Sequence, residues 1–564
     1  MTCKERILSE EYGEIILDFT IGEGQPEFER QECYTRVDEK FEVLYLPLNR
    51  IAGITGSLYT YQYLPGVYGL MADNFNTLSL TASGILQTQR PPLSLKGKGV
   101  IIAFVDTGIL YENEVFLDQI GESRILAIWD QTIQTGTAPE GYHYGSLYTR
   151  EDINEALRSD NPREVVPSTD EIGHGTAMAS VAAGSIVDGG RTFVGAAPEA
   201  DIVVVKLRQA KKYLRDYYFL DSEVPAYAES DIMLGIKFAE SFAIPFERPV
   251  VICLGLGNNF GNHTLGSSLS QYLNRLSTKR ARGIVVCGGN EGNAAHHFSG
   301  RVEPGPGAYE NVEIRVGEGE RGFLMEMWGK VPDVLYASLR TPGGEVIPRF
   351  RLGFGQSLVY RFVYERTVVT IDSILVEPNT GEELIVFRFN GPTPGVWSIQ
   401  IYAGDDRGSN TFNCWLPIRA FLQSETYFLR PDPYTTITDP GISLGPITIS
   451  AYNEVNNSFY VESGRGFLAN GLVKPDLAAV GVDVPTVMGN VTGSSIACAI
   501  AAGGIAQFYE WAVLENNINN VSSQETKSYF IRGAKRSADI TYPNPEWGYG
   551  RFDVAGTFEA LSVV

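Results

Sequence analysis

The chain lacks three features that would indicate a membrane, a secretory or a nucleic-acid-binding protein. We find no run of the roughly 20 apolar residues that a membrane-spanning helix needs, so we expect no membrane span. Residues 1–11 lack the apolar core of a signal peptide, so we expect synthesis in the cytoplasm without ordinary secretion. Basic residues are scarce, with 45 Lys and Arg against 67 Asp and Glu, and the formal net charge of -22 argues against a nucleic-acid partner.

Cysteine and histidine are also scarce, which restricts disulfide and metal chemistry. Among five histidines, His296 and His297 are adjacent, and neighbouring side chains of a strand point to opposite faces, so we expect no metal site there. The six cysteines show neither metal nor disulfide spacing, and three fall in segments that we predict to be core. We therefore expect free thiols in a reducing compartment at Cys3, Cys33, Cys253, Cys287, Cys414 and Cys498.

The chain is long and rich in apolar residues. Its 564 residues, of which 44% are hydrophobic, can bury several cores and form more than one domain. Apolar runs typical of buried strands alternate with amphipathic stretches typical of helices, as at residues 201–207 and 230–239. This alternation predicts an α/β fold with a parallel sheet flanked by helices.

A carboxylate stands at the end of one predicted strand. Residues 99–105 form an apolar run rich in β-branched residues that predicts a buried parallel strand, and Asp106 follows directly. Functional groups of open α/β sheets lie at the carboxyl ends of their strands, and Gly108 then allows a sharp turn. The sequence Asp-Thr-Gly alone also fits an ordinary turn after a strand.

His174 lies between two glycines, at the start of an alanine-rich stretch that predicts a helix ending at Gly184. The small neighbours leave room for a nucleophile on one ring nitrogen and a carboxylate on the other. A structural role is the usual one for a histidine, but His174 alone has this context. Ahead of it, residues 154–171 are polar and acidic, and we expect a surface loop that restricts access by large substrates.

Ser495 opens a long run of small and apolar residues that predicts a buried helix continuing to Tyr509. One interpretation is an N-cap serine, which is the commonest reason for such a pattern. The other is a nucleophile, because a hydroxyl at a helix N-terminus faces free amide donors and a positive dipole end that would stabilise an oxyanion.

The three stretches, in the order Asp, His, Ser, resemble those of the subtilisin-like serine proteases, the subtilases of peptidase family S8. Residues 283–293 resemble the strand and Gly-Asn-Glu-Gly turn of that family, and residues 474–482 resemble its segment upstream of the serine. The sequence departs from the family pattern next to the serine, but no change removes a catalytic group. The changes lie at Ser494, Ile496, Cys498 and Ala499.

The resemblance implies acyl transfer that needs no metal or organic cofactor, while calcium dependence stays open. Ser495 would attack a peptide carbonyl, His174 would take and return the proton, and Asp106 would fix the imidazole tautomer. Asn290 and the Ser495 amide would hold the oxyanion. A glycine-rich stretch resembles the edge on which the family pairs an extended peptide substrate, although an ordinary turn is the alternative. This stretch is Gly255, Leu256 and Gly257.

The resemblance also divides the chain into four segments. Residues 1–80 resemble a prodomain of α+β type, and a small accessory domain is the alternative. A prodomain would assist folding and leave its tail in the active-site cleft. The enzyme itself would cleave it off between about Pro65 and Gly84. Residues 81–300 and 433–564 would form the subtilase domain. Residues 301–432 carry short alternating runs between turns, which predict an inserted antiparallel β-sandwich of jelly-roll type.

This architecture resembles the Csp germination proteases of clostridia. In that family the enzyme sits in the spore and activates the precursor of a cortex-degrading hydrolase, and some members are inactive regulators. The resemblance implies a protein substrate such as a cortex-hydrolase zymogen, and association with spores. Three hypotheses follow: an active endopeptidase of narrow specificity, a catalytically silent regulator or scaffold with a retained prodomain, and a binding role for the sandwich. The intact Asp, His and Ser favour the first.

Overall fold

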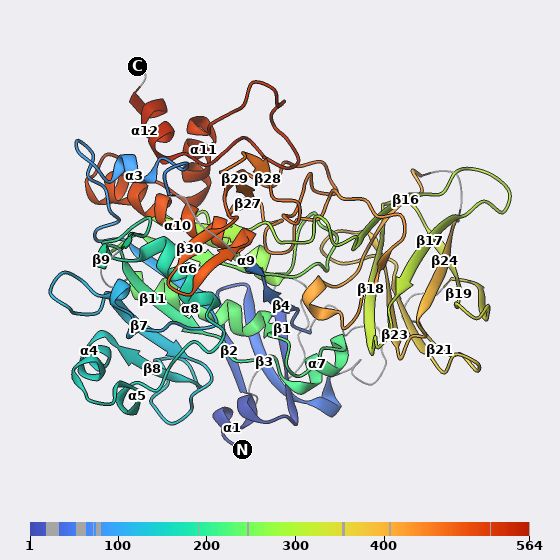
Figure 1. Cartoon of the computed structure of the whole chain (residues 1–564). Helices are drawn as coiled ribbons and strands as arrows, with labels where there is room; N and C mark the ends of the chain where they lie inside the picture. Colours follow the sequence, from blue (N-terminus) through green and yellow to red (C-terminus); the bar gives the residue numbers. More distant parts are fainter. Residues whose placement is uncertain are drawn as a thin grey trace.

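The structure is a computed structural model that describes residues 1–18, 33–51, 64–71, 73–74, 80–189, 191–244, 247–351, 356–404, 408–518 and 520–562. Its centre is a nine-stranded, mainly parallel main sheet in the order β28-β27-β15-β13-β6-β11-β7-β8, with β29 also pairing with β27 (Figure 1). The strands are β6 (Ile101–Asp106), β7 (Ile125–Asp130), β8 (Ser146–Thr149), β11 (Asp201–Lys206), β13 (Val250–Leu254), β15 (Arg282–Cys287), β27 (Ile447–Asn453), β28 (Ser458–Phe459) and β29 (Leu477–Val480).

Both faces of the main sheet are buried, which explains why its strands read as continuous apolar runs. In β6, Ile102 and Phe104 pack into one core, and Ile101 and Val105 pack into the other. The first core takes in α6, α10, α11 and α12, and the second takes in α8 and α9. The predicted α/β fold is confirmed. These helices are α6 (His174–Ala183), α8 (Glu229–Ala243), α9 (Ser268–Leu276), α10 (Ser494–Tyr509), α11 (Ser523–Gly533) and α12 (Val554–Ser562).

Helix α10 corrects one expectation from the sequence. With its π-helical continuation η5 (Glu510–Leu514), it forms a stretch of 21 residues that is long and apolar enough to cross a membrane by length and composition. The prediction that no such segment exists is therefore wrong. The most apolar part of this stretch is 89% buried inside the protein. A core helix contacts other protein on all sides, so it has no polar face to interrupt the apolar run.

Two antiparallel sheets form the predicted sandwich, which lies at one end of the molecule (Figure 1). Alternate residues such as Ile314, Met325 and Trp397 point from both sheets into one separate core. One sheet has the order β16-β25-β18-β23-β22-β21 and the other β20-β19-β24-β17-β26. The strands are β16 (His297–Arg301), β17 (Glu310–Val316), β18 (Gly322–Gly329), β19 (Leu335–Arg340), β20 (Val346–Phe350), β21 (Ser357–Arg361), β22 (Val368–Ile374), β23 (Glu383–Asn390), β24 (Gly395–Ala403), β25 (Thr411–Trp415) and β26 (Tyr427–Phe428).

The beginning of the chain folds into a small sheet in the order β1-β3-β2, which with α1 we call the N-terminal unit. Cys3 and Cys33 form a disulfide there, with Cα atoms 5.1 Å apart, so the prediction of six free thiols is wrong for this pair. The packing of α1 against β2 brings together two cysteines whose spacing gave no such indication. The other four cysteines are free and buried. The elements are α1 (Cys3–Leu8), β1 (Tyr12–Asp18), β2 (Cys33–Arg36) and β3 (Phe41–Pro47).

Buried ion pairs attach the N-terminal unit to the rest of the protein. The Glu14 carboxylate in β1 lies 2.7 Å from the Arg208 guanidinium and 3.2 Å from the Lys211 ammonium, and it accepts a hydrogen bond from Tyr213. Asp231 in α8 contacts the same Arg208 at 2.7 Å. Burial alone would raise the pKa of Glu14, but Lys211 and Arg208 lower it below its ordinary value.

The predicted surface loop at residues 154–171 is wrong in part, because these residues include the end of one helix and a second short helix. The first helix packs beside β7 and β8, the second packs on the first, and Val166 and Asp170 are buried. The short elements of the molecule are α3 (Ile85–Thr88), α4 (Arg150–Arg158), α5 (Pro162–Val165), α7 (Lys212–Tyr218), η2 (Leu48–Arg50), η3 (Glu114–Phe116), η4 (Arg419–Phe421), β4 (Val67–Leu70), β5 (Asp73–Asn74), β9 (Val187–Gly189), β10 (Arg191–Phe193), β12 (Tyr227–Ala228), β14 (Leu256–Gly257), β30 (Val484–Thr486) and β31 (Gly489–Thr492).

Candidate active site

Three residues that are far apart in the sequence meet at one edge of the main sheet. Asp106 is the last residue of β6, His174 is the first of α6, and Ser495 is the second of α10. Asp106 Oδ1 lies 2.7 Å from His174 Nδ1, and His174 Nε2 lies 3.0 Å from Ser495 Oγ. All three residues are buried. The structure thus brings the three sequence-predicted residues into one hydrogen-bonded line.

A close approach of backbones holds Asp106 against His174. The Gly175 amide donates to Thr107 Oγ1 at 2.9 Å, and the Thr107 amide donates to Asp106 Oδ1 at 2.7 Å. A Cβ atom on Gly175 would lie 2.4 Å from the carbonyl oxygen of Gly108. Glycine is therefore required at position 175 for α6 to begin this close to the end of β6.

Asp170 is a residue of this site that the sequence analysis missed, because we assigned it to a surface loop. Its Oδ1 accepts from the Gly173 amide at 2.7 Å, and its Oδ2 accepts from the amide and hydroxyl of Thr176 at 2.9 and 2.7 Å. These bonds satisfy amides at the start of α6 and so fix His174. An acidic residue just ahead of a predicted helix is a capping signal, and this signal could have identified Asp170 from the sequence.

His174 lies in an environment that favours the protonated ring. Burial alone would lower its pKa, but the charge and hydrogen bond of Asp106 raise it above the ordinary value of 6.5, with a further contribution from Asp170. The imidazolium form is thus stabilised at the point where a proton from Ser495 would arrive.

Asn290 lies in the loop after β15, next to the start of α10. Its Oδ1 accepts a hydrogen bond from the Ser494 amide at 3.1 Å, which leaves its Nδ2 group as the available donor. The Ser495 amide donates to the carbonyl oxygen of Met71 at 3.2 Å. A peptide carbonyl of the chain itself therefore lies beside the predicted nucleophile.

The segment that carries this carbonyl occupies the site as an added strand. β4 lies between β12 and β14, with Leu70 opposite Leu256 and Gly69 opposite Gly257. The Met71 amide donates to the Gly255 carbonyl at 3.2 Å. The stretch predicted to pair with a substrate thus pairs with residues 69–71 of the same chain.

The described residues 73 and 74 also lie beside the site. β5, formed by Asp73 and Asn74, pairs with β31, which leads directly to Ser495. The predicted window for self-cleavage, from Pro65 to Gly84, contains residues 72 and 75–79, which lie outside the described residues. Of the described part, Met71 is the residue whose carbonyl the Ser495 amide contacts.

The two adjacent histidines have separate partners. His296 Nδ1 lies 2.6 Å from Glu291 Oε2, while His297 Nε2 lies 3.0 Å from Asn413 Oδ1 and its ring stacks on Trp415. Within the described ranges, no group of three or more His, Cys, Asp or Glu side chains is arranged to hold a metal ion.

Comparison with known families agrees with this geometry. The sequence model of one peptidase family, the Subtilase family, matches residues 97–317 and 429–550, which is more than half of the chain. The chain therefore belongs to the subtilase family, and the predicted subtilisin-like fold is confirmed.

The chain is also similar to the CspB protease of Clostridium perfringens, with 29% identity, a TM-score of 0.75, and coverage of 86% of this chain and 97% of that one. This likeness confirms the resemblance to the Csp proteases. Subtilisin-like proteases SBT3.5 and SBT3.3 of Arabidopsis thaliana are 28% and 27% identical over 41% of this chain. The chain spans 31% of the length of these two relatives.

Proposed function

We propose that the protein is a serine endopeptidase of the subtilisin type and that it cleaves its own chain between Met71 and Ala72. The observation that carries the proposal is the hydrogen bond from the Ser495 amide to the Met71 carbonyl, combined with the Ser495 Oγ to His174 Nε2 contact of 3.0 Å. A carbonyl held by the nucleophile's own amide is in the position of a scissile bond.

The reaction follows from these contacts. Ser495 Oγ attacks the Met71 carbonyl carbon while His174 Nε2 takes the hydroxyl proton, and Asp106 holds the opposite ring nitrogen. The Ser495 amide and Asn290 Nδ2 donate to the oxyanion. His174 then returns the proton to the leaving amine of Ala72, and water hydrolyses the ester that joins Met71 to Ser495. Loss of one oxyanion donor costs about 10²–10³ in turnover, a figure established on subtilisin rather than on this chain.

The Ser495→Ala variant tests the proposal. The full-length chain and its variant are produced side by side, and the intact masses of the products are measured. We expect two fragments from the chain with Ser495 and one whole chain from the variant, because the substitution removes the attacking hydroxyl and leaves the fold. If both the unmodified chain and the variant stay whole, the proposal is contradicted. If both are cut, another enzyme makes the cleavage.

For the finer function, we propose a protein substrate that is a spore cortex-hydrolase precursor, and a location in the spore. The likeness to the CspB protease supports this proposal. The N-terminal unit would act as the prodomain, and β4 would be its tail. Incubation of the processed enzyme with such a precursor, with Ser495→Ala as control, is expected to give a shortened hydrolase only with the active enzyme.

A second candidate function is a silent regulator whose cleft never opens. The occupied cleft favours it, because β4 is paired on both sides and any other peptide would have to displace it. A fluorophosphonate probe separates the two functions. Labelling of Ser495 in the processed protein supports the enzyme, whereas self-cleavage followed by no labelling supports the regulator.

A further inference from the structure

The sandwich contributes residues to the cleft, at the point where β4 crosses it. Residues 418–421, which we call the cover segment, connect β25 of one sandwich sheet to β26 of the other and contact β4 through η4. The side chains of Ile418 and Phe421 in this segment are buried, with 1% and 2% exposed. The cover segment therefore forms a closed wall beside the occupant of the cleft.

A side chain at position 69 would require this buried wall to shift. A Cβ atom on Gly69 would lie 2.6 Å from Ile418 Cδ1 and 3.2 Å from Phe421 Cε1. The φ angle of Gly69 is one that any residue adopts, so space and not backbone conformation favours the glycine. Gly69 lies two residues before Met71, which carries the carbonyl of the proposed scissile bond.

The cover segment is fixed to the loop that carries Asn290. The Arg419 amide donates to Glu291 Oε1 at 2.9 Å, and Glu291 Oε2 lies 2.6 Å from His296 Nδ1. Glu291 is 3% exposed and follows Asn290 directly. A shift of the wall would therefore break buried hydrogen bonds next to the oxyanion donor.

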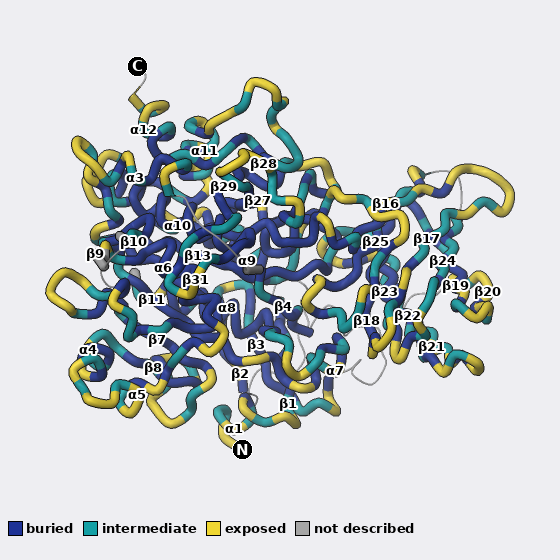
Figure 2. Tube along the Cα trace, viewed as in Figure 1, coloured by how far each residue is buried: buried dark blue, intermediate teal, exposed yellow. Residues whose placement is uncertain are grey.

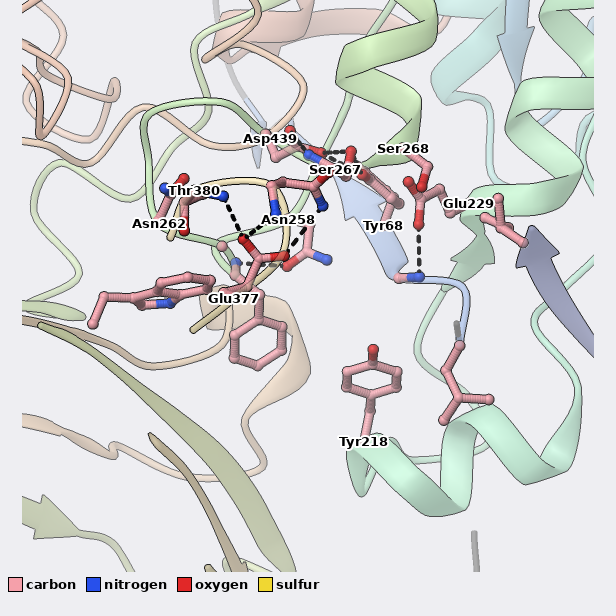
Figure 3. A pocket seen from close by; sticks show the side chains of 18 residues that line it. Tyr68, Tyr218, Glu229, Asn258, Asn262, Ser267, Ser268, Glu377, Thr380 and Asp439 are labelled. Carbon is pink, nitrogen blue, oxygen red and sulfur yellow. Dashed lines mark hydrogen bonds between the residues drawn. The ribbon is translucent and has the colours of Figure 1, made fainter. Parts of the chain in front are cut away.

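The side chain of Tyr68 points to the opposite face of β4 from position 69, because side chains alternate along a strand. Its hydroxyl lies among polar side chains of a pocket (Figure 3). The Tyr68 hydroxyl donates to Asp439 Oδ2 and lies 3.1 Å from Ser267 Oγ. Asp439 also accepts from Ser267 Oγ at 2.6 Å and from Ser270 Oγ. Tyr68 and Asp439 are 1% and 2% exposed, so a phenylalanine at position 68 would leave this buried carboxylate without one of its donors.

We propose that the cleft selects substrates by a Tyr-Gly pair that lies ahead of the cleaved bond. The tyrosine stands three residues, and the glycine two residues, before the residue that supplies the cleaved carbonyl, as Tyr68 and Gly69 stand before Met71. The glycine is imposed by Ile418 and Phe421 of the sandwich, and the tyrosine by Asp439 and Ser267 of the main domain. This inference rests on the proposed function, because it takes residues 68–71 as a bound substrate. It gives the sandwich a role in the choice of substrate.

Self-cleavage of the full chain tests the glycine. Wild type, Gly69→Ala and the double variant Gly69→Ala with Ile418→Ala are made in a cell-free system, and the fraction cleaved is followed over time. We expect Gly69→Ala to be cleaved about tenfold or more slowly, and the double variant to recover to within a few-fold of wild type, because removal of Ile418 Cδ1 makes room for the new methyl group. Equal rates for wild type and Gly69→Ala, or no recovery in the double variant, would overturn the glycine selection.

Tyr68→Phe tests the tyrosine in the same assay. We expect cleavage about tenfold or more slower, since a hydrogen bond to the buried Asp439 carboxyl group is lost. Tyr45→Phe is the matched control and is expected to match wild type, because Tyr45 is buried like Tyr68 but lies in β3 of the N-terminal unit, and the hydrogen bonds to Asp439 and Ser267 are made by Tyr68. Equal rates for Tyr68→Phe and wild type would overturn the tyrosine selection. An uncut wild type would instead contradict the proposed function, and the inference with it.

Discussion

His174 is subject to two opposing effects, and their balance sets the pH at which it works. Burial disfavours the charged ring, whereas Asp106 favours it, and the net effect is a pKa above 6.5. A general base must be neutral to accept a proton, so turnover falls as the pH drops through this raised pKa.

The Asp106→Asn variant tests this account of the pH dependence. Self-cleavage rates are measured between about pH 5 and pH 8. We expect the acid limb of the profile to move to lower pH, because the substitution removes the carboxylate charge and leaves the burial. The maximal rate should also fall by about 10⁴-fold, since the wrong ring tautomer is favoured. An acid limb at the wild-type position would contradict the assignment of Asp106 as the cause of the raised pKa.

Gly175 gives a second prediction for a single residue. We expect Gly175→Ala to destabilise the protein by about 1–3 kcal/mol, because its methyl group would meet the Gly108 carbonyl oxygen. The displaced α6 should slow self-cleavage as well. Urea unfolding measures the first effect. Ala179→Gly in the same helix is the control, expected to lose about 1 kcal/mol without the steric effect on His174. Full activity and stability in Gly175→Ala would contradict the close approach.

The Glu14 cluster makes a prediction for whole elements, since it ties β1 to α8 and the segment before α7. We expect Glu14→Ala to destabilise the N-terminal unit by about 3–5 kcal/mol, because Arg208 and Lys211 would be left buried without their partner. Hydrogen exchange of β1 and β3 is the measurement. Glu11→Ala, at an exposed position of the same unit, should change stability by less than about 0.5 kcal/mol. Unchanged exchange in Glu14→Ala would contradict the role of the cluster.

The same cluster has a defined pH dependence. The folded pKa of Glu14 is lowered, so its contribution to stability is present above the unfolded value near 4.5 and is lost as the pH falls through the folded value. We therefore expect the protection factors of the β1 and β3 amides, which remove the pH dependence of intrinsic exchange, to fall in acid in wild type, and less so in Glu14→Ala.

The elements that the sequence predicted best are those that carry their own local signal. Asp106, His174 and Ser495 each stand at the junction of an apolar run and a turn or helix start, so short motifs were enough to find them. Asp170 and the pairing of Cys3 with Cys33 were missed because they depend on how separate elements pack. Met71 lies inside the window predicted for self-cleavage. Which residue of that window places its carbonyl beside Ser495 depends on the register between β4 and β14, which are far apart in the sequence.

At the scale of the whole molecule, the sandwich and the main sheet share a core. Leu324, Trp328, Val386 and Trp415 on the outer side of one sandwich sheet pack into the same cluster as helices α6 and α10. Figure 2 shows continuous burial from the main sheet into this sheet of the sandwich. The predicted boundaries at residues 80, 300 and 432 stay predictions, and the sandwich strands themselves run from His297 to Phe428.

This shared core predicts that the sandwich and the main domain unfold together. We expect one calorimetric transition for the two, because separation would expose the apolar outer side of the sandwich sheet. Trp415→Ala should lower the temperature of that transition, with a loss of about 3–5 kcal/mol. Two separate transitions, with Trp415→Ala affecting one alone, would contradict the shared core.

The central claim is that the bond after Met71 lies in the catalytic site. The most direct measurement is the N-terminal sequence of the large fragment formed from the full chain, with Ser495→Ala beside it. The account predicts a new N-terminus at Ala72, present only when Ser495 is present. A fragment that begins at any other residue, or the same fragment from the variant, would contradict the claim.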